Sequence, residues 1–216
     1  MVRPLLLAKC VPASVNVVRM GAAAAIGLVA CALVLVACGG RAAKPLSDDH
    51  LQSLVLQPGD LPRQLAQFSF EREIRSEQDA VLRGDPTRFG RQGGWVARYR
   101  RRGNPRAQGP LTVVSTVEMF GRSAGASRYL GAQEEREKTS APTAGLKKIS
   151  VPSIGAESHV LASARAPRAS VRYVVVSWRD GRFVGSVAAS GYAELMSVRD
   201  VVALARSQEK RVEKTA

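Results

Sequence analysis

The strongest structural signal in the chain is a β-hairpin near its C-terminal end. Residues 171–179 (VRYVVVSWR) alternate and are rich in β-branched side chains, and Asp180-Gly181 follows them. An Asp-Gly pair between two such runs is the strongest short-range hairpin signal. With these two residues as the loop, the register sets Trp178 opposite Phe183. The sequence therefore predicts an antiparallel sheet.

One face of this hairpin is apolar, and we expect the core there. Its members are Val174, Val176, Trp178, Phe183 and Val187. A C-terminal helix is predicted to cover them, because Ser197–Asp200 resembles a capping box and valines then repeat at helical spacing. The opposite face carries Tyr173, Val175 and Ser177 beside the small residues of the returning strand. Either a concave surface or a closely packed helix fits that face.

Further strands and helices are predicted along the chain. Strands are expected around Phe68–Phe70 and over residues 95–100, 111–120 and 158–164; helices are expected over 47–55, 76–82 and 123–135, and loops over 84–94 and 136–147. Short strands interleaved with few helices are typical of the α+β class. We predict one domain with an antiparallel sheet of about five to seven strands and its helices, including the C-terminal one, on one face.

An uncharged segment near the N-terminus resembles a signal peptide. Residues 21–37 carry no charge, and Arg3, Lys9 and Arg19 precede them without an acid. These 17 residues fall short of the roughly 20 that a spanning helix needs. An uncleaved anchor and plain secretion are the alternatives, and either Met1 or Met20 could begin the chain.

The end of this segment, Leu35-Val36-Ala37-Cys38, resembles the lipobox of bacterial lipoproteins. The resemblance implies cleavage before Cys38 and a diacylglycerol on its thiol, with palmitate as a typical acyl chain. Such an anchor is effectively permanent, because each buried methylene contributes about 0.8 kcal/mol. We therefore divide the chain into a signal peptide (1–37), a tether (38–45) and a domain (46–216), held by lipid on the extracytoplasmic face of the cell membrane.

The cysteines exclude a disulfide in the predicted domain. Cys10 and Cys31 lie in the leader, and Cys38 would carry the lipid. The stability of the domain must therefore come from its core.

A second resemblance concerns the domain itself. Residues 54–62 (LVLQPGDLP) look like the opening of actinobacterial lipoprotein and sensor domains. The order of elements over 46–212 is similar to small envelope lipoproteins and sensor domains of the PsbP/Mog1-like or kinase-ectodomain type. This resemblance implies a fold and transfers no site residue.

The chain is strongly basic, with a net charge of +14, and 25 of its 32 basic residues are arginine. Outside the cytoplasm, a basic surface meets anionic lipid or acidic envelope polymers rather than nucleic acid. Arg98, Arg100 and Arg102 alternate along one predicted strand and are the candidate ligand-binding residues. A solvated hairpin tip and an arginine bias from high-GC coding are the alternative explanations.

One pattern suggests catalysis. Gly121–Gly125 matches G-x-S-x-G between a strand and a helix, which would make Ser123 a nucleophile and His159 its base. The orienting acid would be Glu134, Glu135, Glu137 or Glu157. Hydrolases with this motif need a mostly parallel sheet, however, and this chain predicts an antiparallel one. We therefore expect no enzyme.

Metal and cofactor sites are not expected. His50 and His159 are the two histidines of the chain, and nothing near them has ligand spacing. Both are predicted to be surface polar residues.

Three functions remain at this stage. The first is a monomeric, non-enzymatic binding or sensing module for an anionic or amphiphilic envelope ligand. The second is an accessory subunit that docks on a larger envelope complex, which predicts an exposed apolar patch. The third is the Ser123 hydrolase.

Overall fold

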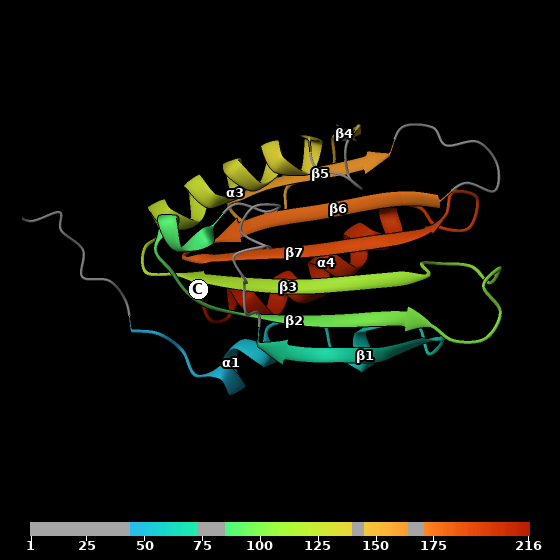
Figure 1. The fold of residues 1–216 in the computed structure, drawn as a ribbon, viewed down its shortest axis with the longest axis horizontal. Coiled ribbons are helices and arrows are strands. Elements are labelled where there is room, and N and C mark those ends of the chain that lie inside the picture. Colours follow the sequence, from blue (N-terminus) through green and yellow to red (C-terminus); the bar gives the residue numbers. More distant parts are fainter. Residues whose placement is uncertain (1–43, 73–84, 140–144, 164–170) are drawn as a thin grey trace, which may run out of the picture. The chain divides into compact units, whose positions relative to one another are not determined.

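The computed structural model describes residues 44–72, 85–139, 145–163 and 171–216. Their centre is one seven-stranded antiparallel sheet with the order β1-β2-β3-β7-β6-β5-β4 (Figure 1). The strands are β1 Leu65–Arg72, β2 Arg91–Arg101, β3 Thr112–Phe120, β4 Leu146–Lys148, β5 Glu157–Ser163, β6 Val171–Asp180 and β7 Phe183–Tyr192. The helices are α1 Asp48–Ser53, α3 Ser123–Thr139 and α4 Val198–Glu213, with 3-10 turns η1 Pro58–Asp60 and η2 Pro86–Phe89.

This architecture confirms the predicted α+β class, the antiparallel sheet and the C-terminal helix. The helical turns predicted over 76–82 lie outside the described residues. Residues 136–139 extend α3 and residues 146–148 form β4, so the loop predicted over 136–147 was too long. In the described part of the chain, no helix is long and apolar enough to cross a membrane.

The helices lie on both sides of the sheet. α1 and α4 share an apolar cluster with the odd-numbered residues of β2, whereas α3 packs against Phe120 and Val184 on the other side (Figure 1). Successive residues of a strand point to opposite faces, so each strand serves both layers. We call these two layers the α4 side and the α3 side.

The α4 side holds the main core, as the sequence predicted. Trp178, Phe183 and Val187 are fully buried there against the stripe of α4 that includes Val201 and Val212. The predicted capping box starts α4: Asp200 N donates to Ser197 Oγ (3.2 Å) and Ser197 N donates to Asp200 Oδ2 (2.9 Å). Each large apolar side chain buried in this way contributes about 1.5–3 kcal/mol.

A satisfied polar network crosses this core. Gln208 of α4 is 0% exposed, accepts from Ser115 Oγ (2.7 Å) and donates to Thr116 O (2.8 Å). Ser115 Oγ in turn accepts from Leu56 N (2.9 Å), and Tyr99 OH donates to Leu56 O (2.6 Å). Burial, with a smaller effect of Asp60, raises the pKa of Tyr99 to about 12, so its hydroxyl remains a donor. The network fixes the leucine run before η1 to β2 and β3.

The β6–β7 hairpin has a different register from the predicted one. Trp178 lies opposite Gly185 and Asp180 opposite Phe183, so the two turn residues are Gly181 and Arg182. Gly181 has φ +50, which places the left-handed backbone at the first turn position, where glycine is favoured. The predicted register of the hairpin was therefore wrong by two residues. A shift of two keeps every side chain on its face, which is why the predicted core face is correct.

Strand β1 contains a bulge that breaks its predicted alternation. The register with β2 shifts between Gln67 and Ser69. The extra residue, Phe68, is 56% exposed, whereas Phe70 packs edge-on against Trp95 with ring centroids 5.6 Å apart. A bulge at a sheet edge turns the strand and hinders pairing with another chain.

Candidate functional site

The G-x-S-x-G segment is a packing junction between β3 and α3. A Cβ on Gly125 would lie 2.2 Å from the carbonyl oxygen of Phe89, so this glycine lets η2 approach α3. Gly121 N also donates to Gly90 O (2.9 Å). Close contact with the backbone of η2 thus explains the glycine at position 125.

The structure separates the two catalytic candidates. Ser123 is the exposed first residue of α3, whereas His159 contacts the helix at Glu134 and Glu137. Eleven helical steps from Ser123 to Glu134 correspond to a rise of about 16 Å. A serine and its base must lie within hydrogen-bond reach, so these two residues do not form a dyad.

His159 is buried under α3, which corrects the prediction of a surface residue. It is 3% exposed, its Nε2 lies 3.0 Å from Glu137 Oε2 and its Nδ1 lies 3.7 Å from Glu134 Oε2. His50, by contrast, is exposed on α1 as predicted, 3.4 Å from Thr215 Oγ1. The neighbouring sequence contained no signal for the burial of His159, because the covering helix comes from residues more than twenty positions earlier.

A polar layer continues from His159 across the α3 side. Gln133 Nε2 donates to Glu137 Oε1 (2.7 Å) and to Ser177 Oγ (3.3 Å), and Ser177 Oγ donates to Ser186 Oγ (3.1 Å). Small hydroxyl side chains on β6 and β7 therefore allow α3 to pack closely. This observation supports helix packing, rather than a concavity, over that part of the hairpin.

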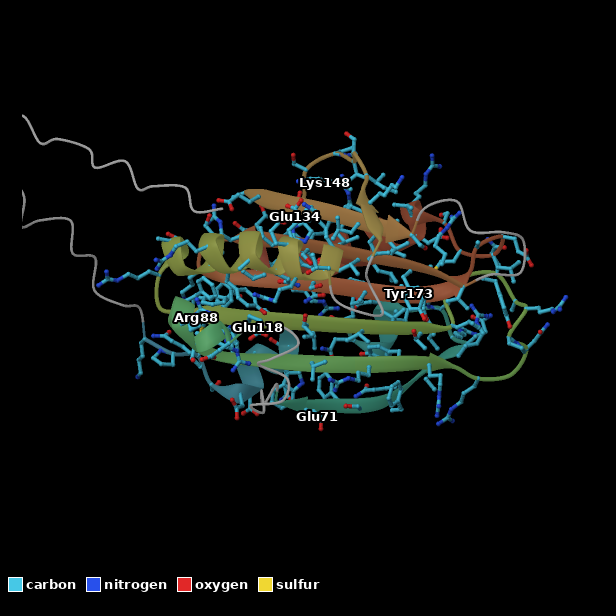
Figure 2. All side chains as sticks on the ribbon, turned by 45° about the horizontal axis from the view of Figure 1, so that its top comes forward. Glu71, Arg88, Glu118, Glu134, Lys148 and Tyr173 are labelled. Carbon is cyan, nitrogen blue, oxygen red and sulfur yellow. The ribbon has the colours of Figure 1, made fainter. Side chains whose placement is uncertain are left out.

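Glu134 carries the densest charge contacts of this layer. Its Oε1 lies 3.0 Å from both Lys138 Nζ of α3 and Lys148 Nζ of β4. Figure 2 labels Glu134 and Lys148. Burial raises the pKa of Glu134, but hydrogen bonds from the two lysines and the charge of His159 outweigh it and leave the pKa below its usual value. Lysines on both sides make the pair Glu134–His159 a poor metal site, and no cluster of metal-ligating residues occurs among the described residues.

Glu157 forms a second ion pair under α3. It accepts from Arg179 Nη2 (2.8 Å) and from Ser127 Oγ (2.9 Å to Oε2). Burial raises the pKa of Glu157, but the hydrogen bonds from Arg179 and Ser127 lower it by more. The pKa of Glu157 therefore lies below its usual value. Of the four acids proposed to orient His159, Glu134 and Glu137 lie beside it and Glu157 is bound elsewhere.

A buried ion pair that the sequence did not indicate joins β2 to β3. Arg91 Nε donates to Glu118, and both side chains are largely buried. A Cβ on Gly94 would lie 2.5 Å from Arg91 Nη2 and 2.7 Å from Glu118 Oε2. The glycine therefore makes room for the pair. Gly93 and Gly94 lie inside β2, so the loop predicted over 84–94 was too long, and glycines inside a strand can mark such a close approach.

The three candidate arginines form a row on the α3 side. Arg98 and Arg100 of β2 pair with Val114 and Thr112 of β3, on the face shared with Val184, and Arg102 continues their alternation. Arg98 Nη1 donates to Glu71 Oε1 (2.8 Å), and the guanidinium carbon of Arg100 lies 5.4 Å from the Phe68 ring centroid. Arg100 and Arg102 are exposed and form no ion pair with the described part of the chain.

Small and hydroxyl side chains lie beside this arginine row. Thr112 Oγ1 and Ser190 Oγ are 2.6 Å apart, and Ala188 precedes Ser190 on the same face of β7. Tyr173 of β6, 36% exposed, lies at the same end of the sheet and is labelled in Figure 2, opposite the end that bears Arg88. The arrangement can hold an anion by charge and hydrogen bonds. Cys38, the predicted lipid site, lies outside the described residues.

Comparison with known proteins gives a fold and no family. No known protein-family profile and no curated protein sequence matches the chain. Among solved structures, the fold is similar to the extracellular domain of PknH from Mycobacterium tuberculosis, with a TM-score of 0.56 and 9% identity over 78% of this chain and 98% of that domain. This likeness supports the expected kinase-ectodomain type of fold.

Proposed function

We propose that this chain is an extracytoplasmic lipoprotein, anchored through a diacylglycerol on Cys38, whose domain is a non-enzymatic binding or sensing module for an anionic envelope ligand. The observation that carries the proposal is the row of Arg98, Arg100 and Arg102 on the α3 side. The lipobox resemblance and the likeness to an extracellular domain support the location.

The charge of the arginine row supports anion binding. The Arg98 charge is balanced by Glu71, whereas Arg100 and Arg102 have no acid partner in the described residues. Stacking of Arg100 near Phe68 limits the freedom of its side chain, so less entropy is lost when it binds. Arginine suits this role because its planar guanidinium offers paired donors to a carboxylate or phosphate.

The two competing functions have weaker support. The separation of Ser123 from His159 removes the basis for the hydrolase. For the accessory subunit we expected a continuous apolar patch, but the exposed large apolar residues of the described chain are Phe68, Val171 and Tyr173. Four strand spacings separate β1 from β6, about 19 Å, so Phe68 and Tyr173 do not form one patch.

The anchoring part is tested by mass spectrometry of the protein purified from its own membrane. We expect a chain that begins at Cys38 and carries the mass of a diacylglycerol. An intact leader, or no acyl mass on Cys38, would overturn the lipoprotein assignment.

The binding part is tested by thermal melting with tripolyphosphate and with dihexanoyl phosphatidylglycerol. We expect either anion to raise the melting temperature, and the double variant Arg100→Ala/Arg102→Ala to abolish the rise. The matched control Arg88→Ala/Arg122→Ala removes two exposed arginines from the other end of the sheet and should keep the rise. Equal shifts in both variants, or no shift in the native protein, would contradict the proposal.

A further inference from the structure

We infer that the arginine end of the sheet binds an extended anionic polymer and not the bilayer that holds the anchor. By the arginine end we mean Arg63, Arg100, Arg102 and Arg106, which lie where β1 begins and β2 ends. The inference rests on the proposed function and specifies the source of its anionic ligand.

The chain enters the domain at the opposite end of the sheet. Arg182, in the β6–β7 turn, donates from Nη1 to Lys44 O (2.9 Å), and Lys44 is the first described residue. Strand β7 then runs from Phe183 beside this turn to Ser190, which pairs with Thr112, the partner of Arg100. Lys44 and the arginine row therefore lie at opposite ends of the same strands.

The separation exceeds the reach of the tether. Seven residues of β7, from Phe183 to Ser190, correspond to about 24 Å. The six peptide links from Cys38 to Lys44 span at most about 22 Å in any conformation. When the strands stand upright on the bilayer, charges about 24 Å from the tethered end are screened from the lipid, because the Debye length at physiological salt is about 8 Å.

The distribution of charge distinguishes the two ends. All four residues of the arginine end are exposed, and none has an ion pair within the described part of the chain. Arg102 N donates to Gln64 O (2.8 Å), which holds the turn of Arg63 beside the row. At the tethered end, basic and acidic residues are equal in number and lie close together. The basic residues are Lys44, Arg88, Arg122 and Arg182, and the acidic residues are Asp48, Asp49, Asp85 and Asp180. At the arginine end, the exposed acid of the neighbouring β7–α4 loop is Glu194, and the four arginines outnumber it. An anion is therefore attracted more strongly to the arginine end than to the tethered end.

The shape of the α3 side favours a linear ligand. α3 packs on β5, β6 and β7, and a helix with its side chains is about 10–12 Å thick. A flat bilayer resting on this side would meet α3 before it reached the sheet surface. A polymer chain can lie beside α3, and the arginines of β2 recur every second residue, about 7 Å apart, which suits regularly repeated anionic groups.

The experiment uses the acylated protein in phosphatidylcholine nanodiscs, with fluorescent long-chain polyphosphate as the probe. We expect Arg100→Glu/Arg102→Glu/Arg106→Glu to weaken polyphosphate binding about tenfold or more, because each reversal replaces an attraction by a repulsion. The control Arg88→Glu/Arg122→Glu/Arg128→Glu makes the same change of charge at exposed positions away from this end, and should change the affinity less than threefold. Thermal melting of both variants checks that they fold.

Exchange of the disc lipid for phosphatidylglycerol separates the polymer from the bilayer. If the arginine end faces away from its membrane, the affinity for polyphosphate at physiological salt should change less than about threefold. A loss of tenfold or more in anionic discs would show that the arginines lie on the lipid, which overturns this inference and leaves anion binding intact. Failure of the native protein to bind polyphosphate in either disc would also overturn the inference. If it then shows no melting shift with tripolyphosphate or dihexanoyl phosphatidylglycerol, the proposed function fails as well.

Discussion

The two sides of the sheet are built on different chemistry although they share the same strands. At the centre of the α4 side, the buried polar residues Ser115 and Gln208 are uncharged, and the hydroxyl of Ser115 donates a hydrogen bond to the amide oxygen of Gln208. The α3 side holds His159, Glu134 and Glu157 in charged contacts, and further along it presents the arginine row. The α4 side thus decides whether the chain folds, and the α3 side decides which charges the folded sheet presents.

This difference follows from the cost of burying charge. A buried ion pair contributes little net stability, because desolvation offsets the attraction of its partners. Apolar contacts have no such offset. We therefore expect substitutions on the α4 side to alter stability strongly, and substitutions on the α3 side to alter pH dependence or binding.

The largest effect is expected for Trp178→Ala on the α4 side. The indole is fully buried against Gly185, so its removal leaves a cavity and should lower the free energy of unfolding by about 3–5 kcal/mol. Urea denaturation measures this loss. Trp95→Ala, at a half-buried site near the sheet edge, should cost clearly less. Equal losses would contradict the assignment of the main core.

A smaller loss is expected for Gln208→Leu. This change leaves Thr116 O without its donor and Ser115 Oγ without its acceptor, which should lower the free energy of unfolding by about 1–3 kcal/mol. Ser207→Ala, at a half-buried position of the same helix, is the control, with a change below about 0.5 kcal/mol. If Gln208→Leu stabilises the protein, the network is dispensable for the fold.

On the α3 side, Glu134→Gln should change the response to acid. The folded-state pKa of Glu134 lies below its usual value of 4.5, so its charge stabilises the fold above that value, and this stability is lost as the pH falls through the lower pKa. Unfolding free energies measured from pH about 6 to about 3 should therefore fall less in Glu134→Gln than in the native protein, by about 1 kcal/mol at most. Glu135→Gln, whose side chain is 74% exposed, should follow the native curve.

The smallest effect on stability is expected at the arginine row. Arg100→Ala/Arg102→Ala should change the free energy of unfolding by less than about 1 kcal/mol, because both side chains are exposed and without ion pairs in the described chain. Chemical denaturation provides the measurement. A loss of several kcal/mol would mean that the row supports the fold, and the contrast between the two sides would fail.

Local patterns in the sequence predicted the elements well. The caps Ser47 and Ser197 lie where α1 and α4 begin, and the apolar alternation of β6 and β7 identified the core face correctly. These features depend on neighbours a few residues apart. The capping bond, the turn and the pleat are all short-range effects.

The sequence could not predict which helix covers which side. α3 and α4 were both expected on one face, but α3 crosses to the other because its buried residues Tyr129 and Leu130 pack against Phe120 and Val184. The burial of His159 follows from that placement. The same limit applies to the candidate site, since the arginine row was visible in the alternation of β2 but the Arg91–Glu118 pair depends on a contact between two strands.

The close fit of Trp178 on Gly185 also has a consequence for how the hairpin is aligned. In the alternative alignment, two residues away, Trp178 would face Phe183 and two bulky rings would compete for the space of one, while the gap at Gly185 would stay empty opposite Val176. Because Gly185 has no side chain, the indole of Trp178 fits against the neighbouring strand at this position only. In this way a single glycine selects one strand alignment among several that would expose the same faces.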